Sequence, residues 1–211
     1  MQADLHDQAS TTAAIVLAAG QSRRMGQPKL VLPWGNTTII RRVVQVLQQA
    51  GISETVVVTG SQPDLIEAAL QDCPVRCVYN PDYLIDLMLI SLQTGLNALP
   101  ESAESALIVL GDQPQIEPEI VRAILECFYH FHERLIIPSY QNHRGHPWLL
   151  PRSFWSDLLT WSQPQTLRDF IVDHSSQIHY LPVSSSSVVA DIDTPADYAH
   201  DRPSPSPENA V

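Results

Sequence analysis

Residues 13–29 read AAIVLAAGQSRRMGQPK, an apolar run that ends in a glycine and a group of basic side chains. The run from Ala13 to Ala18 shows no polar alternation, which is typical of a strand buried on both faces of a sheet. A glycine directly after such a strand lets backbone N–H groups approach a phosphate, because no Cβ stands between them. The stretch therefore predicts a buried strand and an anion-binding loop, although the same letters also fit a surface turn with scattered basic residues.

The rest of the chain alternates strand-like and helix-like segments. Short apolar runs predict strands at 55–59, 75–79 and 106–110, and apolar residues at helical spacing predict helices at 38–50, 61–70, 87–99 and 118–131. A weaker pattern follows, with strands at 135–137, 147–150 and 177–183 and helices at 153–161 and 166–174. This alternation predicts an α/β fold, a three-layer Rossmann-like single domain with a mostly parallel sheet. The loops after Ala18, Thr59, Tyr79 and Leu110 would then share the edge of the sheet where ligands bind.

Composition indicates one cytoplasmic domain. A chain of 211 residues with 44% hydrophobic residues suits a single core, which we place at residues 13–200. Residues 1–12 are polar and expected to be flexible, and residues 201–211 alternate proline and serine, a composition typical of disorder. We find neither a secretory signal nor an apolar run of the roughly 18–20 residues that cross a bilayer. The three cysteines form no CxxC pair, which fits a reducing compartment.

Net charge argues against polyanionic partners. The formal charge of −11 disfavours binding to nucleic acid or to an anionic membrane surface. Five of the twelve basic residues nevertheless fall between Arg23 and Arg42, and Lys29 is the only lysine of the chain. The cluster is either positive potential reserved for an anion or a chance grouping, and charge alone does not choose between the two.

Acidic residues follow two further apolar segments. Asp112 comes directly after the most hydrophobic predicted strand, which places its carboxylate at the ligand-binding edge. Asp191 and Asp193 alternate around Ile192, so an extended backbone would point both carboxylates to one side. Carboxylate oxygens are ligands that Mg²⁺ prefers. The alternative for each position is a helix cap, with Thr194 and the proline after it opening a helix.

Four ordered motifs resemble one family. They are LAAGxSxRMGxxKL from Leu17, VLGDQP at 109–114, RGHP at 144–147 and DIDTP at 191–195. Together they resemble the signature of the MobA-like NTP transferases, and especially that of the molybdenum cofactor cytidylyltransferase branch. The resemblance covers roughly residues 13–199 and implies a sheet of the nucleotide-diphospho-sugar transferase type.

The resemblance implies roles for specific residues. Catalytic roles fall to Lys29, Arg24 and Asp112. Binding of Mg²⁺ is assigned to Asp112 and Asp193, with Asp191 as a weaker candidate. The residues that would bind the nucleotide are Leu17, Ala18, Ala19, Gly20, Ser22, Arg23, Arg24, Lys29, Asn80 and Ser91. Acceptor contacts fall to Arg144 and His146, and the alternative for His146 is a turn histidine that precedes Pro147.

One stretch departs from the family pattern. Residues 80–96 resemble a segment written roughly NPxYxxGMxxSLxxGL, but Asp86-Leu87-Met88 stands where its first glycine is expected, and Ile90 replaces a frequent serine. In the family this segment lies near the base and the ribose. The departures therefore fall where the family recognises its nucleotide.

The function implied by the resemblance is Mg²⁺-dependent transfer of CMP from CTP to the phosphate of molybdopterin, with release of pyrophosphate. An acceptor phosphate is already anionic, so catalysis would rest on positioning and electrostatic stabilisation. Such an enzyme would also make transient contact with a molybdoenzyme or its chaperone. The alternatives are transfer to a sugar phosphate or another small phosphate, and a non-catalytic nucleotide-binding protein that delivers a cofactor.

Overall fold

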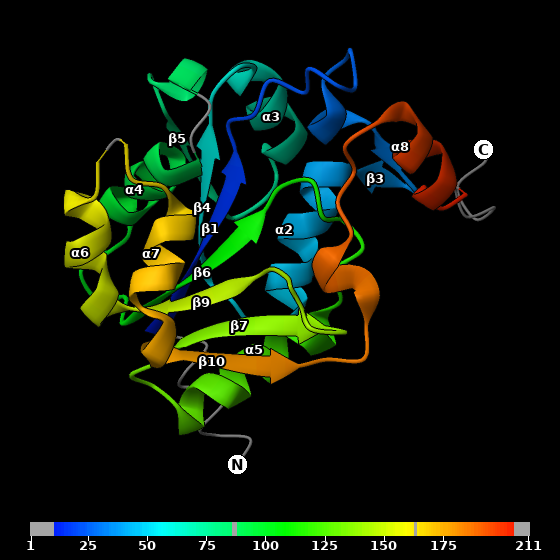
Figure 1. The fold of residues 1–211 in the computed structure, drawn as a ribbon. Helices are drawn as coiled ribbons and strands as arrows, with labels where there is room; N and C mark the ends of the chain where they lie inside the picture. The colour runs from blue at the N-terminus through cyan, green and yellow to red at the C-terminus, as the bar shows by residue number, and fades with distance from the viewer. Residues whose placement is uncertain (1–10, 86–87, 163, 205–211) are drawn as a thin grey trace.

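The computed structural model describes residues 11–85, 88–162 and 164–204, whose strands form a mixed sheet with helices on both faces (Figure 1). The strand order is β10-β7-β9-β6-β1-β4-β5, and β8 pairs with β7. The strands of this sheet are β1 (Thr12–Ala18), β4 (Glu54–Thr59), β5 (Arg76–Tyr79), β6 (Ser105–Leu110), β7 (Leu135–Tyr140), β8 (His143–Arg144), β9 (Trp148–Pro151) and β10 (Ile178–Pro182). Two further strands, β2 (Pro33–Trp34) and β3 (Thr37–Thr38), form a separate hairpin.

The half of the sheet that positions the site is parallel. Strand β1 pairs in parallel with β4 on one side and with β6 on the other, and β5 adds to β4 in the same direction. Ala18 lies opposite Thr59, and Leu17 lies opposite Leu110, so these strands end at a common edge. The predicted parallel core is therefore confirmed. The other half is mixed, because β9 runs antiparallel to both β6 and β7.

Helices cover both faces of the sheet, as the apolar run of β1 predicts. The helices are α2 (Ile39–Gln49), α3 (Pro63–Leu70), α4 (Met88–Ala98), α5 (Pro118–His130), α6 (Trp155–Thr160), α7 (Leu167–Asp173) and α8 (Pro195–Asp201). Ala14 and Val16 pack in one core with α2, α3 and α5, whereas Ala13 and Ile15 pack in a second core with α4, α6 and α7. Successive β1 side chains thus enter opposite layers, and the three-layer prediction is confirmed (Figure 1).

Several short elements escaped the sequence patterns. Besides the β2–β3 hairpin and β8, the backbone forms 3-10 turns at Lys29–Val31, Tyr83–Ile85, Arg152–Phe154, Ser175–Gln177 and Ser186–Val189. The helix predicted at 153–161 is one such turn followed by α6. Elements of two to four residues carry too few side chains to show a period, so only tertiary contacts define them.

The C-terminal helix α8 contacts two segments that lie far from it in the sequence. Thr194 caps α8, because its hydroxyl accepts from the backbone N–H of Asp197 while the Asp197 carboxylate accepts from the Thr194 N–H. The Tyr198 hydroxyl donates to the carbonyl of Pro33 at 2.7 Å, and the Gln115 amide donates to Asp201 at 3.0 Å. Two boundaries predicted from the sequence shift, because Asp201 of the predicted tail ends α8 and Thr12 of the predicted flexible segment begins β1. Residues 1–10 and 205–211 lie outside the described residues. Among the residues that are described, no helix is long and apolar enough to cross a membrane.

Candidate active site

A cavity of about 550 Å³ opens at the carboxyl ends of β1 and β6. Its walls come from segments far apart in the sequence. The lining residues are Leu17, Ala18, Ala19, Gly20, Gln21, Ser22, Arg23, Arg24, Lys29, Leu30, Tyr83, Met88, Ser91, Leu110, Asp112, Asp191 and Asp193. Most of the residues that the sequence assigns to a nucleotide or a metal are among them. Ligands bind at this edge of an open α/β sheet as a rule.

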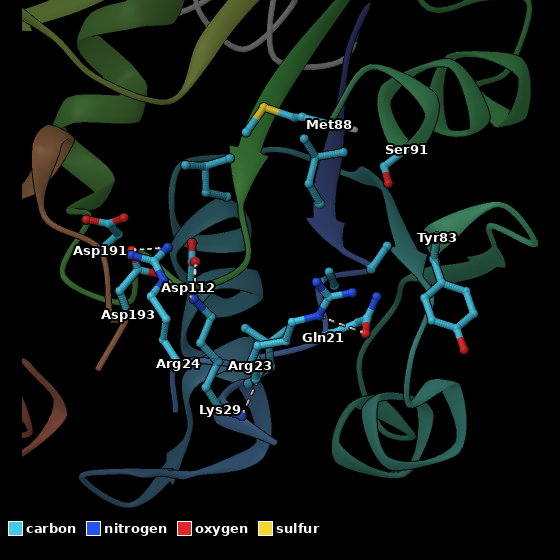
Figure 2. Close-up of a pocket in the computed structure, with 17 residues that line it drawn as sticks. Gln21, Arg23, Arg24, Lys29, Tyr83, Met88, Ser91, Asp112, Asp191 and Asp193 are labelled. Carbon is cyan, nitrogen blue, oxygen red and sulfur yellow. Dashed lines mark hydrogen bonds and ion pairs between the residues drawn. The ribbon is translucent and has the colours of Figure 1, made fainter. Parts of the chain in front are cut away.

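Charged side chains gather on one side of the cavity (Figure 2). The Lys29 ammonium donates to Asp112 Oδ2 at 2.6 Å and to Asp193 Oδ1 at 3.0 Å. Arg24 Nη2 pairs with the other oxygen of Asp193, Oδ2, at 2.8 Å. Lys29 is largely covered, with 12% of its side chain exposed, whereas the Arg24 side chain is 71% exposed. Two carboxylates therefore converge on one largely covered ammonium, and an exposed arginine pairs with the outer oxygen of Asp193.

Backbone contacts hold the carboxylates in place. The Gly111 N–H donates to the carbonyl of Leu17, and a Cβ on Gly111 would lie 2.9 Å from that oxygen, so only glycine lets the chain pass β1 this closely. The Ile192 N–H donates to the carbonyl of Asp112 at 3.0 Å, and the Ile192 side chain is fully buried. Asp191 and Asp193 on either side of it both line the cavity. The strand that the sequence predicts here is absent, but both carboxylates still face the cavity because Ile192 between them is buried.

The loop after β1 is shaped by hydrogen bonds to its own backbone. The carbonyl of Ser22, a residue with φ of 50°, accepts the N–H groups of Met25 and Gly26. The Ser22 hydroxyl accepts from the backbone N–H of Lys29 at 3.3 Å. The Ser61 hydroxyl donates to the carbonyl of Gly20 at 2.9 Å and fixes the loop to the end of β4. Ser22 therefore positions Lys29 as well as lining the cavity.

The grouped charges change each other's proton affinity. Burial alone would lower the pKa of Lys29, but the Asp112 and Asp193 carboxylates outweigh burial and raise it above its usual value. Burial, together with repulsion from Asp193 and Asp112, raises the pKa of Asp191. The ammonium is consequently held in its charged form, and the third carboxylate adds negative charge that favours cations.

The carboxylate pair is suited to a hard divalent ion whose other ligands come from a bound substrate and water. No group of three or more His, Cys, Asp or Glu side chains that could hold a metal exists within the described part of the chain. Asp112 and Asp193 do converge on one cation. An ion held by these two would take its remaining oxygen ligands from phosphate and water, as Mg²⁺ commonly does. The residues therefore fit Mg²⁺ when phosphate and water complete its coordination.

Uncharged side chains form the other side of the cavity, where Figure 2 shows Gln21, Tyr83 and Ser91 apart from the aspartates. Gln21 Oε1 accepts from Arg23 Nε at 3.2 Å, and Gln21 Nε2 is buried with no partner among the described residues. Asn80 does not line the cavity. It is buried and donates through Nδ2 to the Ser91 hydroxyl at 3.1 Å, so it acts on the cavity by orienting Ser91.

The two predicted acceptor residues lie outside the cavity lining. Arg144 is exposed on β8, with its guanidinium carbon 5.8 Å from the centre of the Tyr180 ring. The His146 ring stacks on Trp148, with 4.6 Å between centroids, and its backbone N–H donates to the carbonyl of Val188. Burial lowers the pKa of His146 to about 4. The structure thus places Arg144 beside Tyr180 and His146 against Trp148, both outside the cavity lining.

Sequence reasoning overlooked five lining residues: the apolar Leu30 and Leu110, and Gln21, Tyr83 and Met88. Gln21 stands at a variable position of the loop motif, and Met88 stands in the stretch that departs from the family pattern. Tyr83 was within the NPxY segment, whose spacing was the available signal. Residues Asp86 and Leu87 of the same departure lie outside the described residues.

Comparisons with known proteins agree with this geometry. Residues 14–178 match the family model described as the MobA-like NTP transferase domain. The molybdenum cofactor cytidylyltransferase of Escherichia coli (strain K12) is 28% identical over 187 residues, 87% of this chain and 92% of that protein. The structure of Rv0371c from Mycobacterium tuberculosis H37Rv is similar with a TM-score of 0.79 and 26% identity, over 91% of this chain and 97% of that one.

Two further solved structures are informative. A nucleotidyl transferase from Methanothermobacter thermautotroptrophicus superposes with a TM-score of 0.77 at 26% identity, over 91% of this chain and 96% of that one. A manganese complex of the Mycobacterium tuberculosis protein superposes with a TM-score of 0.73 at 25% identity, over 90% of this chain and 97% of that one. One relative of similar length and fold therefore binds a divalent metal.

Proposed function

We propose, because this chain belongs to the MobA-like NTP transferase family, that it transfers CMP from CTP to the phosphate of molybdopterin. The chain is a nucleotidyltransferase by that membership. The choice of donor and acceptor is supported by its similarity to the Escherichia coli molybdenum cofactor cytidylyltransferase along most of both chains. The observation that carries the proposal is the convergence of Lys29, Asp112 and Asp193 at the end of the parallel strands.

The reaction needs little more from the protein than placement and charge. An oxygen of the acceptor phosphate forms a bond to the α-phosphorus of CTP, and the bond from that phosphorus to the bridging oxygen breaks, which releases pyrophosphate. The acceptor is already anionic at neutral pH, so no general base is required. The barrier lies in bringing two anions together and in stabilising the leaving group.

The cations of the loop suit the triphosphate. Arg24 is exposed and pairs with Asp193, from where its guanidinium can turn onto a bound phosphate, and Lys29 offers a compact charge between the two aspartates. Backbone N–H groups around Gly20 can approach the phosphates closely, since a Cβ there would meet nothing within 4 Å. Asp112 and Asp193 would hold Mg²⁺, which supplies Lewis-acid polarisation of the phosphate oxygens when bound.

The uncharged side of the cavity is proposed to take the nucleoside. Gln21 and Ser91 offer polar groups there, and Tyr83 offers an aromatic ring beside them (Figure 2). Arg144 and His146 remain proposed contacts of the acceptor. The segment that follows Val188 links them to the cavity, because Val188 accepts from the His146 backbone and Asp191 lies shortly after it.

The test is pyrophosphate release from ATP, CTP, GTP and UTP with Mg²⁺, with and without molybdopterin. We expect release from CTP only when molybdopterin is present. The Asp112→Ala protein is the blank, and losing one preorganised charge should lower the rate by about 10²–10³-fold. Release from another NTP would correct the donor, and release with a sugar phosphate would correct the acceptor. Tight CTP binding without any release would favour a non-catalytic carrier.

A further inference from the structure

We propose that the Lys29 ammonium and a divalent metal are alternative occupants of the Asp112–Asp193 carboxylate pair, so that metal binding moves Lys29 onto the nucleotide. The inference rests on the metal site of the proposed function and adds to it a role for Lys29 as a removable internal cation. In this proposal Lys29 couples the binding of the metal to the binding of the nucleotide.

The distances make the two cations exclusive. Lys29 Nζ already lies 2.6 Å from Asp112 Oδ2 and 3.0 Å from Asp193 Oδ1. Mg²⁺ demands oxygen ligands at about 2.0–2.1 Å. An ion that used both of these oxygens would occupy the space of the ammonium itself, and two like charges at contact repel strongly. Lys29 must therefore leave before or while the metal binds.

The surroundings decide where Lys29 can go. The acidic side chains of the cavity lining are Asp112, Asp191 and Asp193. Once a metal holds the first and the third, the anions within reach of the ammonium are Asp191 and a bound phosphate. The Lys29 backbone stays anchored by the Ser22 hydroxyl, so only its flexible side chain has to move.

Charge balance explains why the exchange favours the nucleotide. The lining holds three basic side chains, Arg23, Arg24 and Lys29, against three carboxylates, and their formal charges cancel. In that state the basic groups are engaged, with Lys29 and Arg24 both on Asp193. A divalent ion makes the same wall net positive and frees Lys29, so a triphosphate binds more tightly. Coupling of this kind acts equally in both directions.

The sole lysine of the chain supplies a direct probe. Protein labelled with ¹³C,¹⁵N-lysine should show one lysine side-chain signal, which belongs to Lys29. We expect Mg²⁺ alone to shift this signal along a saturating curve, and CTP added afterwards to shift it again. In Asp112→Asn the Mg²⁺-dependent shift should be absent. A signal that does not move while Mg²⁺ binds at an Asp112-dependent site would overturn the proposal.

Metal affinity provides the second readout, measured with Mn²⁺ by electron paramagnetic resonance in the absence of nucleotide. Lys29→Met should bind Mn²⁺ about tenfold more tightly than the natural protein, within the usual range of coupling between sites. Lys29→Arg keeps the charge and should bind Mn²⁺ weakly, and Arg24→Met should have a smaller effect because Arg24 does not bridge the pair. Mn²⁺ binding that needs CTP in the natural protein but not in Lys29→Met also supports the exchange.

Failure of the inference and failure of the proposed function look different. Equal Mn²⁺ affinity of Lys29→Met and the natural protein, with both affinities lost in Asp193→Asn, would overturn the exchange and leave the metal site intact. Mn²⁺ affinity that is absent with and without CTP, or indifferent to Asp112→Asn and Asp193→Asn, would remove the metal site and the exchange together. Thermal melts show whether each variant is folded, and the lysine signal tests the natural protein without any substitution.

Discussion

Gln21 carries a polar atom for which the described residues offer no partner. Its Oε1 accepts from Arg23, while its Nε2 is buried and unpaired in the wall of the cavity. A buried donor without a partner costs about 1–3 kcal/mol of stability. A native protein that keeps such a group calls for an explanation, and a ligand that accepts from the group is one. Arg23 is exposed, so a phosphate that attracts it would also release Gln21 Oε1 and leave the whole amide to a ligand.

We predict that Gln21→Leu weakens nucleotide binding about tenfold and leaves the unfolding free energy unchanged or higher. The loss corresponds to roughly 1.4 kcal/mol for one hydrogen bond to the ligand. Isothermal titration with CTP and Mg²⁺ measures the affinity. Gln27→Leu is the matched control, because Gln27 is an exposed glutamine of the same loop that does not line the cavity. Equal affinities for the two variants would contradict a role for Gln21.

His146 makes the stability of the protein depend on pH. Its pKa is lowered to about 4 in the folded protein by burial, compared with 6.5 for an unperturbed histidine. Between these values the unfolded chain binds more protons than the folded one, so the folded state loses stability as pH falls. The full stability is present above pH 6.5 and declines until the pH reaches about 4, by up to about 3 kcal/mol.

We predict that His146→Leu flattens this decline. Urea unfolding at pH 7, 6 and 5 gives the free energy of unfolding at each pH. The natural protein should lose more stability over this range than the His146→Leu variant does. His143→Gln is the control, since His143 is exposed on the preceding strand β8. An unchanged pH dependence in His146→Leu would assign the decline to other groups.

At the scale of the element, α4 owes its position to a glycine. A Cβ on Gly95 would lie 2.4 Å from Cγ2 of Ile15 and 3.2 Å from Cγ2 of Val58. The helix therefore approaches β1 and β4 more closely than any larger residue would permit. Its first turns carry Met88 and Ser91 to the cavity. The packing of one helix on the sheet thus sets one wall of the site.

We predict that Gly95→Ala destabilises the protein by about 1–3 kcal/mol, despite the higher helix propensity of alanine. The added methyl group overpacks a core whose neighbours are fully buried. Chemical denaturation measures the change. Asn97→Ala is the control, because Asn97 is exposed on the same helix and gains the propensity without the clash. A Gly95→Ala protein as stable as the control would show that α4 can shift freely.

At the scale of the whole molecule, the site joins the two ends of the domain. Lys29 follows the first strand and Asp193 precedes the last helix, and α8 returns to Pro33 through Tyr198. Any ligand that bridges these segments binds the folded state and not the unfolded chain. Binding should therefore be visible as global stability.

We predict that CTP with Mg²⁺, at one hundred times the dissociation constant, adds about 2.7 kcal/mol to the unfolding free energy. For a protein of this size that is a rise of roughly 5–10 °C in Tm. Differential scanning calorimetry with and without CTP measures it, and EDTA should remove most of the rise. Asp112→Asn should show little rise in Tm. Asp72→Asn is the control, because Asp72 is an exposed carboxylate that pairs with Arg41 away from the cavity lining. Equal rises in the two variants would place the nucleotide elsewhere.

Local sequence patterns were enough to predict the parallel core and the residues at its carboxyl-terminal edge. Uninterrupted apolar runs such as Ala13 to Ala18 predict strands covered on both faces, and parallel strands must end at one edge. Gly20, Lys29 and Asp112 follow such runs, so their common location could be predicted. The alternation of Asp191 and Asp193 about a buried Ile192 was likewise readable.

Which of these side chains contact each other could not be read from local patterns and became visible in the fold. Lys29 meets Asp193 across 164 residues of chain, and it does so because β1, β6 and the segment before α8 pack side by side. The fold also keeps Arg144 and His146 out of the cavity lining and places Gln21 in the cavity wall. The physical reason is that periodicity records which face of an element is buried, whereas contacts between distant segments depend on how the elements pack in three dimensions.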